Sequence, residues 1–221
     1  MIAIVDYGMG NLKSVCNALE SIGEKARIIQ NPADLKSSAG IILPGVGAFR
    51  DGMDHLREHS FLEPLQEEVL RKKKPYLGIC LGMQFLAEQS EEGGRHPGLG
   101  WVPGTVRQIV TEGQPFKVPH MGWNDLRLER PSALYAGLPE EPVFYFVHSF
   151  HLQPTQENKE WITATCQHGT TITASLQKDN IFGVQFHPEK SQRVGLQLLK
   201  NFIQFTHAYA EKTADPCPYP A

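Results

Sequence analysis

The sequence predicts an α/β protein with an open mixed, mainly parallel sheet flanked by helices. Short continuous apolar runs, such as 2–5 and 76–80, are typical of parallel strands buried on both faces. Segments with helical periodicity lie between these runs, as in strand–helix–strand units. The second half instead contains several short strand-like segments, and a tight turn joins one pair. Ligands bind at the carboxyl ends of strands in open α/β sheets, so the segments that follow the strands form the candidate site.

The first half of the chain alternates between strands and helices. Strands are expected at 2–5, 26–29, 40–43 and 76–80. A helix is expected at 11–22, and helical sequence returns at 49–73 with a break near 60–64. Pro75 opens the fourth strand, and a further helix is expected directly after that strand, at 81–89.

The second half consists mainly of expected strands. They lie at 104–110, 143–146, 161–166, 171–177 and 181–186. A turn at 178–180 joins the last two as a hairpin, and a final helix is expected at 192–209. We expect one domain over 1–210 and a flexible tail at 211–221, which contains three prolines.

Length and charge exclude several classes of function. A chain of 221 residues can bury a stable core but has no room for a second catalytic domain. The formal net charge is -3, and no long stretch is strongly basic. The basic run at 71–74 is most simply a solvated helix end that complements the helix dipole. Nucleic acid is therefore not an expected partner.

The cysteines favour a reducing compartment. They stand at positions 16, 80, 166 and 217, without a closely spaced pair, which predicts neither a zinc site nor a disulfide framework. The N-terminus lacks the basic start and the length of a signal peptide. No apolar stretch reaches the roughly 18 residues of a membrane span. We expect a cytoplasmic protein.

Cys80 is the candidate nucleophile. It lies in the run Gly78-Ile79-Cys80-Leu81-Gly82, between an expected strand and an expected helix. The two glycines remove side chains that would collide at a sharp turn, as in the nucleophile elbow of hydrolases. The start of a helix favours the thiolate over the thiol. Most free cysteines are buried and structural, so a reactive Cys80 requires a partner base elsewhere in the chain.

His187 and Glu189 are the candidate base and its orienting acid. They lie two residues apart, so in an extended chain both side chains leave the same face. Pro188 restricts the backbone between them and favours an extended His187. The carboxylate can then select the imidazole tautomer and stabilise the imidazolium, as the acid does in a serine triad.

A nucleophile that attacks a carbonyl also needs donors for the developing oxyanion. The backbone N–H of Leu81 is one expected donor, because it follows the nucleophile. The second is expected from Val46 or Gly47 in the loop Pro44-Gly45-Val46-Gly47, whose glycines let a peptide present its N–H or turn away. An ordinary strand-to-helix turn explains that loop equally well.

Several motifs resemble one enzyme family. GICLGMQ and QFHPEKS are similar to the motifs of class I, triad-type glutamine amidotransferases. PGVGAF, PHMGWN and FVHSFH further resemble the glutaminase subunits of imidazole glycerol phosphate synthases. The resemblance runs from DYGMGN at residue 6 to about residue 205, and it implies a flavodoxin-like core. Many members have paired glycines in the oxyanion loop, where this chain has Val46.

The resemblance implies a glutaminase reaction. Cys80 would attack the side-chain amide of glutamine, and His187 would protonate the departing ammonia. Water activated by His187 would then hydrolyse the glutamyl thioester to glutamate. The residues implied to bind or enclose glutamine are Gly47, Gln84, His148, Ser149 and Phe150.

The resemblance also implies a partner. Ammonia must be consumed on another polypeptide, which the resemblance identifies as a (β/α)8-barrel cyclase that forms a heterodimer with this chain. The cyclase would make imidazole glycerol phosphate and AICAR from PRFAR in histidine biosynthesis. The candidate contact residues are Met9, Asn11, Trp123, Asn124 and Lys190. We expect slow glutamine hydrolysis by the lone chain, because the partner favours the state in which the Val46 peptide turns inward.

Three other functions are compatible with parts of the sequence. The chain could serve anthranilate or purine synthesis, although PHMGWN argues against that, or it could be a γ-glutamyl hydrolase without a partner. A non-catalytic scaffold is disfavoured by the intact Cys80, His187 and Glu189.

Two pairs of histidines could suggest a metal site: His55 with His59, and His148 with His151. Neither pair has a convincing third ligand, so we expect no metal or other cofactor.

Overall fold

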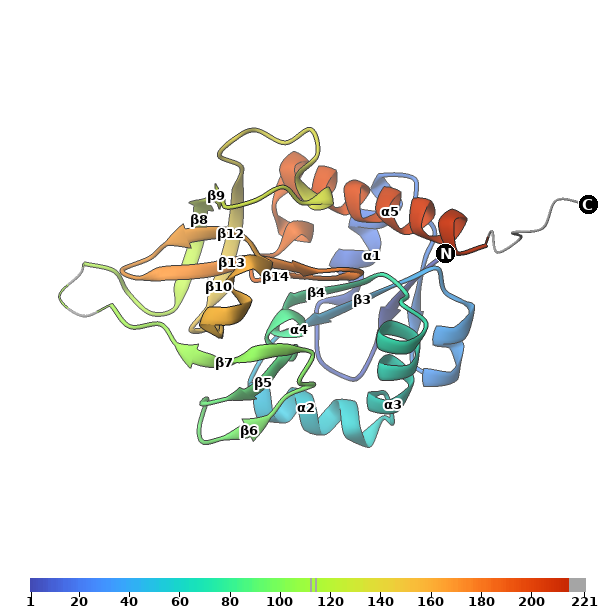
Figure 1. Ribbon diagram of the computed structural model, residues 1–221, viewed down its shortest axis with the longest axis horizontal. Helices are drawn as coiled ribbons and strands as arrows, with labels where there is room; N and C mark the ends of the chain where they lie inside the picture. The colour runs from blue at the N-terminus through green and yellow to red at the C-terminus, as the bar shows by residue number, and fades with distance from the viewer. Residues whose placement is uncertain (112, 114, 215–221) are drawn as a thin grey trace, which may run out of the picture.

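Residues 1–111, 113 and 115–214 are described by the structure, a computed structural model (Figure 1). The first half of the chain forms β1 (Ile2–Val5), α1 (Leu12–Ser21), β2 (Ala26–Ile29), η1 (Pro32–Ser37), β3 (Gly40–Gly45), α2 (Phe49–Glu58), α3 (Leu62–Leu65), η2 (Gln66–Arg71), β4 (Tyr76–Cys80) and α4 (Leu81–Gln84). The second half forms β5 (Ala87–Ser90), β6 (His96–Pro97), β7 (Val102–Gln108), β8 (His120–Asp125), β9 (Arg127–Leu128), η3 (Ala133–Tyr135), β10 (Val143–His148), β11 (Phe150–Pro154), η4 (Gln156–Trp161), β12 (Ile162–Gln167), β13 (Thr171–Lys178), β14 (Ile181–Val184), η5 (Pro188–Lys190) and α5 (Gln192–Ala214).

The main sheet is mixed and mainly parallel, as predicted. In the described part of the chain its eight strands run in the order β2-β1-β3-β4-β14-β13-β12-β9. The first five pair in parallel, and the remaining three add antiparallel strands at one edge. Helices α1 and α5 cover one face, whereas α2 and α3 lie on the other (Figure 1).

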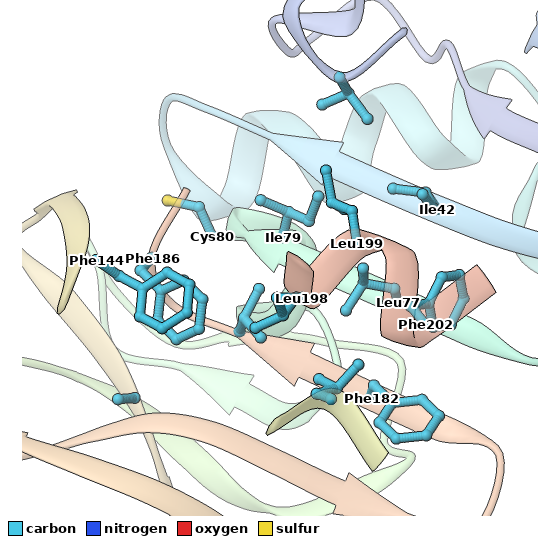
Figure 2. Close-up of a cluster of buried hydrophobic side chains, with 14 of the residues drawn as sticks. Ile42, Leu77, Ile79, Cys80, Phe144, Phe182, Phe186, Leu198, Leu199 and Phe202 are labelled. Carbon is cyan, nitrogen blue, oxygen red and sulfur yellow. The ribbon is translucent and has the colours of Figure 1, made fainter. Parts of the chain in front are cut away.

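The sheet separates two apolar clusters. In β1, Ile2 and Ile4 face the cluster under α1 and α5, whereas Ala3 and Val5 face the cluster under α2. Successive strand residues point to opposite faces, so a strand buried on both faces reads as an unbroken apolar run. Figure 2 shows the first cluster, with Cys80 at its margin and its sulfur directed away from the aliphatic side chains.

Two smaller sheets were missed by the sequence patterns. One is four-stranded, in the order β11-β7-β5-β6, and the other pairs β10 with β8. Strands β5, β6, β8, β9 and β11 were not predicted. They are short, and in β8 the polar residues His120 and Asn124 interrupt the expected apolar alternation.

The helix predicted at 81–89 is wrong beyond its first turn. Helix α4 ends at Gln84, and Ala87 begins β5. The amide of Leu99 donates to the Phe85 carbonyl (2.8 Å) and that of Gly100 to the Ala87 carbonyl (2.9 Å). These tertiary hydrogen bonds override the local helical pattern.

The expected solvated basic end at 71–74 is also wrong in part. Arg71, Lys72 and Lys73 are exposed, but the Lys74 ammonium lies 2.8 Å from the buried Glu68 carboxylate. Lys74 also donates to the Leu35 carbonyl at 2.6 Å. It therefore joins η2 to η1 rather than facing solvent.

The remaining boundaries differ by a few residues. The predicted break at 60–64 is confined to the turn around Ser60 (φ 57°), and Pro64 lies inside α3. Strand β14 ends at Val184, and β3 extends to Gly45. Helix α5 includes 211–214, which were predicted as tail, and 215–221 lie outside the described residues.

Candidate active site

Cys80 stands at a sharp turn between β4 and α4. Its backbone has φ 54° and ψ -108°, a conformation that non-glycine residues rarely adopt. A Cβ on Gly82 would lie 1.8 Å from the Leu43 carbonyl oxygen, and one on Gly78 would lie 2.4 Å from the Gly82 carbonyl oxygen. Both glycines are thus required by close backbone approach, as the elbow pattern predicted.

The short α4 changes the electrostatic argument for Cys80. A single helical turn has too few aligned peptides for a full macrodipole at its N-terminus. The Gln185 amide donates to the Cys80 sulfur at 3.7 Å, and the sulfur lies 4.0 Å from the Val147 carbonyl. Stabilisation of a thiolate therefore depends mainly on neighbouring side chains.

His187 and Glu189 form a tight buried pair. The Nδ1 atom of His187 lies 2.7 Å from Oε1 of Glu189, and both side chains are almost fully buried. His187 has the expected extended backbone, but Glu189 lies in the short turn η5, which begins at Pro188. The turn, rather than strand alternation, brings the carboxylate to the imidazole. Ser191 Oγ donates to the His187 carbonyl at 2.6 Å and holds this turn.

The charge environment favours a protonated His187. Burial by itself lowers the pKa of the imidazole, but Cys80 and Glu189 outweigh burial and raise the pKa to about 10. The Nε2 atom makes no hydrogen bond of ordinary geometry with the described residues. We therefore attribute the effect of Cys80 to the charge of a thiolate near the ring rather than to a formed hydrogen bond.

A cavity of about 380 Å³ opens beside Cys80. Its wall contains Val46, Gly47, Cys80, Leu81, Gln84, Glu92, Pro119, Val147, His148, Ser149 and Phe150. All the candidate oxyanion and glutamine-binding residues therefore line one cavity, although they come from three separate parts of the chain. His187 and Glu189 are not in the wall but lie behind it.

Gln84 is held in the cavity wall by its amide nitrogen. Nε2 donates to the Phe150 carbonyl at 2.8 Å and to Oε1 of Gln185 at 3.1 Å. The Gln84 carbonyl oxygen makes no hydrogen bond with the described residues and is free to accept one from a ligand. Gln185 connects Gln84 to the Cys80 sulfur, a contact for which local sequence offered no signal.

The loop after β3 lies next to Cys80. Gly45 pairs with Cys80 in the parallel ladder, and the exposed Val46 and Gly47 follow at the cavity mouth. Gly47 has φ 100°, which favours glycine. A Cβ on Gly47 would lie 2.8 Å from the Met9 methyl carbon, so Met9 packs against this loop.

Glu92 is a cavity residue that sequence reasoning missed. It accepts a hydrogen bond from the Phe49 N–H (2.8 Å), at the first residue of α2. It supplies the one carboxylate among the residues that line this cavity. The contact joins residues 43 apart, and the acidic pair at 91–92 gave no local sign of it.

The candidate contact residues fall into three places. Trp123 is half exposed and packs edge-on against Tyr145, and the Lys190 ammonium lies 5.9 Å from the same tyrosine ring. Asn11 is exposed and caps α1, accepting from the Ser14 N–H at 3.3 Å. Asn124 is half buried, and its amide turns inward.

The two histidine pairs make contacts of other kinds. His55 and His59 stack with ring centroids 6.0 Å apart, and the Nδ1 atom of each contacts a backbone carbonyl. His151 contacts Gln153 and accepts from the Thr173 N–H. Within the described ranges no three histidine, cysteine, aspartate or glutamate residues gather as metal ligands.

The helices of the described part of the chain include none that is long and apolar enough to cross a membrane.

The chain matches the family described as glutamine amidotransferase class-I over residues 3–205. It is 49% identical over 204 residues to imidazole glycerol phosphate synthase subunit HisH 1 of Campylobacter jejuni (strain RM1221), covering 92% of this chain and 100% of that protein. It is 48% identical over 201 residues to subunit HisH of Moorella thermoacetica, covering 91% and 93%.

Solved structures share the fold at low identity. A glutamine amidotransferase crystal structure aligns with a TM-score of 0.72 at 19% identity, covering 94% of this chain and 100% of that one. A chain of PurLQS from Thermotoga maritima aligns with a TM-score of 0.71 at 19% identity, covering 92% and 97%. These structures support the arrangement of strands and helices described above.

Proposed function

The chain belongs to the class-I glutamine amidotransferase family, and on that premise we propose that it is the glutaminase subunit of an imidazole glycerol phosphate synthase. It hydrolyses glutamine to glutamate and ammonia and supplies the ammonia to a cyclase subunit. One observation carries the reaction: Cys80 opens onto a cavity lined by polar groups while the His187–Glu189 pair lies behind it. This conjunction suits a thiol that attacks a carboxamide.

The first half-reaction forms a thioester. The Cys80 sulfur attacks the side-chain carbonyl carbon of glutamine, and the C–N bond breaks. The leaving nitrogen takes a proton from His187 and departs as ammonia. The raised pKa of His187 means that the proton is present before the attack.

The second half-reaction restores the thiolate. Neutral His187 accepts a proton from water, which attacks the thioester carbonyl and releases glutamate. Glu189 holds the Nδ1–H of the ring throughout, so Nε2 is the atom that gives and takes the proton. The freedom of Nε2 from other hydrogen bonds suits this role.

The oxyanion that forms in each step needs two donors. The Leu81 N–H at the start of α4 is one, and the loop after β3 supplies the other from Val46 or Gly47. Val46 is exposed and Gly47 has a left-handed φ, so the peptide between β3 and α2 can turn without disturbing the core. We expect the partner subunit to favour the inward pose.

The remaining cavity residues hold the amino acid. The free carbonyl oxygen of Gln84 accepts from glutamine, and Ser149 and Gly47 offer further polar contacts at the wall. Glu92 can pair with the α-ammonium group, a charge that a peptide-bound glutamine lacks. His148 and Phe150 enclose the site.

The partner is a (β/α)8-barrel cyclase, which uses the ammonia to form imidazole glycerol phosphate and AICAR from PRFAR in histidine biosynthesis. We assign Met9, Asn11, Trp123, Asn124 and Lys190 to its contact surface. The exposed Trp123 and Met121 of β8 support this assignment, because large apolar side chains are enriched at interface centres.

We also propose that residues 1–210 act as one domain and that the protein works in the cytoplasm. A shared sheet supports the first point, since β1 and β14 belong to the same eight-stranded sheet. The described cysteines Cys16, Cys80 and Cys166 are unpaired, which suits a reducing compartment.

A glutaminase assay with and without the cyclase and its nucleotide ligand tests the proposed function. Wild type should release glutamate rapidly only with the partner, and Cys80→Ala should reduce turnover by at least about a thousandfold. A glutamyl thioester trapped on Cys80 would appear in the mass spectrum of wild type. Equal turnover without the cyclase, or activity on γ-glutamyl conjugates by the lone chain, would overturn the proposal.

A further inference from the structure

A chain of hydrogen bonds runs from strand β8 to the cavity. Nδ2 of Asn124 contacts Nε2 of His120 at 3.2 Å, and Nδ1 of His120 contacts Nε2 of His148 at 3.0 Å. Nδ1 of His148 contacts the Phe150 carbonyl at 2.9 Å, and this carbonyl also accepts from Gln84 at 2.8 Å. Asn124 is thereby connected, through two buried imidazoles, to a side chain in the cavity wall.

The chemistry of the end groups sets the direction of every bond. The Phe150 carbonyl can only accept, so Nδ1 of His148 carries its proton. Nε2 of a neutral His148 must then accept from Nδ1 of His120, which leaves Nε2 of His120 to accept from Asn124. The Asn124 amide is oriented independently, because its nitrogen also donates to the Gln167 carbonyl at 2.9 Å.

The two imidazoles are held in place and remain neutral. They lie directly opposite each other in the β8–β10 ladder. The His120 ring stacks between Phe146 and His168, with centroids 4.5 and 4.1 Å away. Burial is the main cause that lowers the pKa of His120 to about 4 and of His148 to about 3. Neither ring can move its proton from Nδ1 to Nε2 without breaking one of these hydrogen bonds.

The other face of β8 is exposed. Met121 and Trp123 alternate with the inward residues of the strand and are 62% and 50% exposed. Trp123 is cross-strand from Tyr145 in the ladder. One short strand therefore presents an apolar outer face and, on its inner face, the start of the hydrogen-bond chain to the cavity.

We propose that His120 and Asn124 are positioning residues for glutamine binding, because they orient His148 and through it the Phe150 carbonyl that anchors Gln84. The inference rests on the proposed function, since the cavity concerned is the one assigned to glutamine. Asn124 thus acts from the inner face of β8, behind Trp123.

The tautomers test the hydrogen-bond chain without any assay of activity. Long-range ¹⁵N–¹H spectra of the wild-type protein should show His120 and His148 both protonated at Nδ1 and bare at Nε2 at neutral pH. In Asn124→Asp the carboxylate can only accept, so His120 should acquire a proton at Nε2. An Nε2–H tautomer of either ring in wild type would overturn the inference.

Kinetics of the two-subunit enzyme test the positioning role. Asn124→Leu and His120→Phe, which keeps the ring stack, should raise KM for glutamine about tenfold and change kcat less than about twofold. The matched control is Asn201→Leu. Asn201, like Asn124, donates two amide hydrogen bonds; its acceptors are the carbonyls of Leu134 and Ala136, neither of which lines the cavity.

The control separates positioning from general loss of stability. Asn201→Leu should lower the melting temperature as much as Asn124→Leu and leave KM within about twofold of wild type. Equal KM values for Asn124→Leu and Asn201→Leu would overturn the inference even if His120→Phe fails to fold. If wild type shows no Cys80-dependent hydrolysis, the proposed function fails, and the tautomers still test the hydrogen-bond chain.

Discussion

At the scale of single residues, Cys80 combines a strained backbone with a buried ionic environment. A left-handed conformation costs a non-glycine residue about 1–3 kcal/mol and persists only where the surroundings enforce it. Here Gly78 and Gly82 allow β4 and α4 to pack closely around the turn. The same turn aims the sulfur away from the apolar cluster (Figure 2).

The charge on His187 makes stability depend on pH. Its folded pKa, about 10, lies above the unfolded value of about 6.5, so the protonated ring stabilises the fold fully below about pH 6.5. This contribution is lost as the pH rises through about 10. Glu189→Gln removes a carboxylate that raises the pKa, so the contribution should be smaller in this variant and its loss should be complete at a lower pH.

Chemical denaturation from pH 6 to pH 10 checks this expectation. The difference in unfolding free energy between wild type and Glu189→Gln should shrink as the pH rises, because other groups titrate alike in both proteins. If the unfolding free energies of wild type and Glu189→Gln differed by a constant amount across this pH range, the raised pKa of His187 would not depend on Glu189.

At the scale of elements, the closest packing joins α4 to β3. Gly82→Ala places a methyl group 1.8 Å from the Leu43 carbonyl, so the two elements must separate. We expect a loss of about 3 kcal/mol or more in unfolding free energy, measured by denaturant titration. Gly93→Ala is the control, since a Cβ there meets nothing within 4 Å and costs only about 1–2 kcal/mol of left-handed strain. Equal losses would contradict the steric account.

Lys74 is the second element-scale contact. Its ammonium pairs with the buried Glu68 carboxylate, which Lys72 also contacts at 2.7 Å, and it donates to the Leu35 carbonyl in η1. Lys74→Met leaves both acceptors without this ammonium, and we expect a loss of about 3 kcal/mol. The exposed neighbour Lys73 offers the control, and Lys73→Met should change the unfolding free energy by less than about 0.5 kcal/mol. If Lys74→Met lowered the unfolding free energy no more than Lys73→Met does, the Lys74 ammonium would not be needed to neutralise Glu68.

Local patterns predicted the elements best where burial is complete. The strands β1 and β4 match their apolar runs, because each face of such a strand meets an apolar layer. Strand β2 was also predicted, although Arg27 and Ile28 are exposed. The elbow helix was predicted too long, because hydrogen bonds from Leu99 and Gly100 draw the chain after α4 into β5. A local pattern contains no information about a partner that lies more than ten residues away.

At the scale of the whole molecule, the exposed face of β8 is the expected contact surface for the cyclase. Trp123→Ala should weaken association with that subunit at least about tenfold, because a large aromatic anchor is lost. The free energy of unfolding of the lone chain should fall by only about 1 kcal/mol, because the contact with Tyr145 is lost but half of the side chain is already exposed.

Calorimetric titration of the two subunits measures this effect. Ile28→Ala is the control, because Ile28 is a partly exposed apolar residue on β2, an edge strand of the main sheet, to which β8 does not belong. Wild-type affinity in Trp123→Ala, or an equal loss in Ile28→Ala, would show that β8 is not the contact.

The sequence by itself determined the α/β order, the family and the candidate residues Cys80, His187 and Glu189. These follow from local features of the sequence: apolar runs, an elbow with two glycines, and the QFHPEKS motif. The roles of these three residues stay predictions until turnover is measured. Local features suffice here because a sharp turn or a buried strand constrains the residue types at adjacent positions.

Only the tertiary structure decided how the cavity is completed. It placed Gln185 between Gln84 and the sulfur, brought Glu92 to the start of α2, and linked Asn124 to His148. These contacts join residues far apart in the chain, and polar side chains of the same types occur throughout the sequence. Each buried polar group takes the partner that the packed fold provides, so its role is settled by the three-dimensional arrangement.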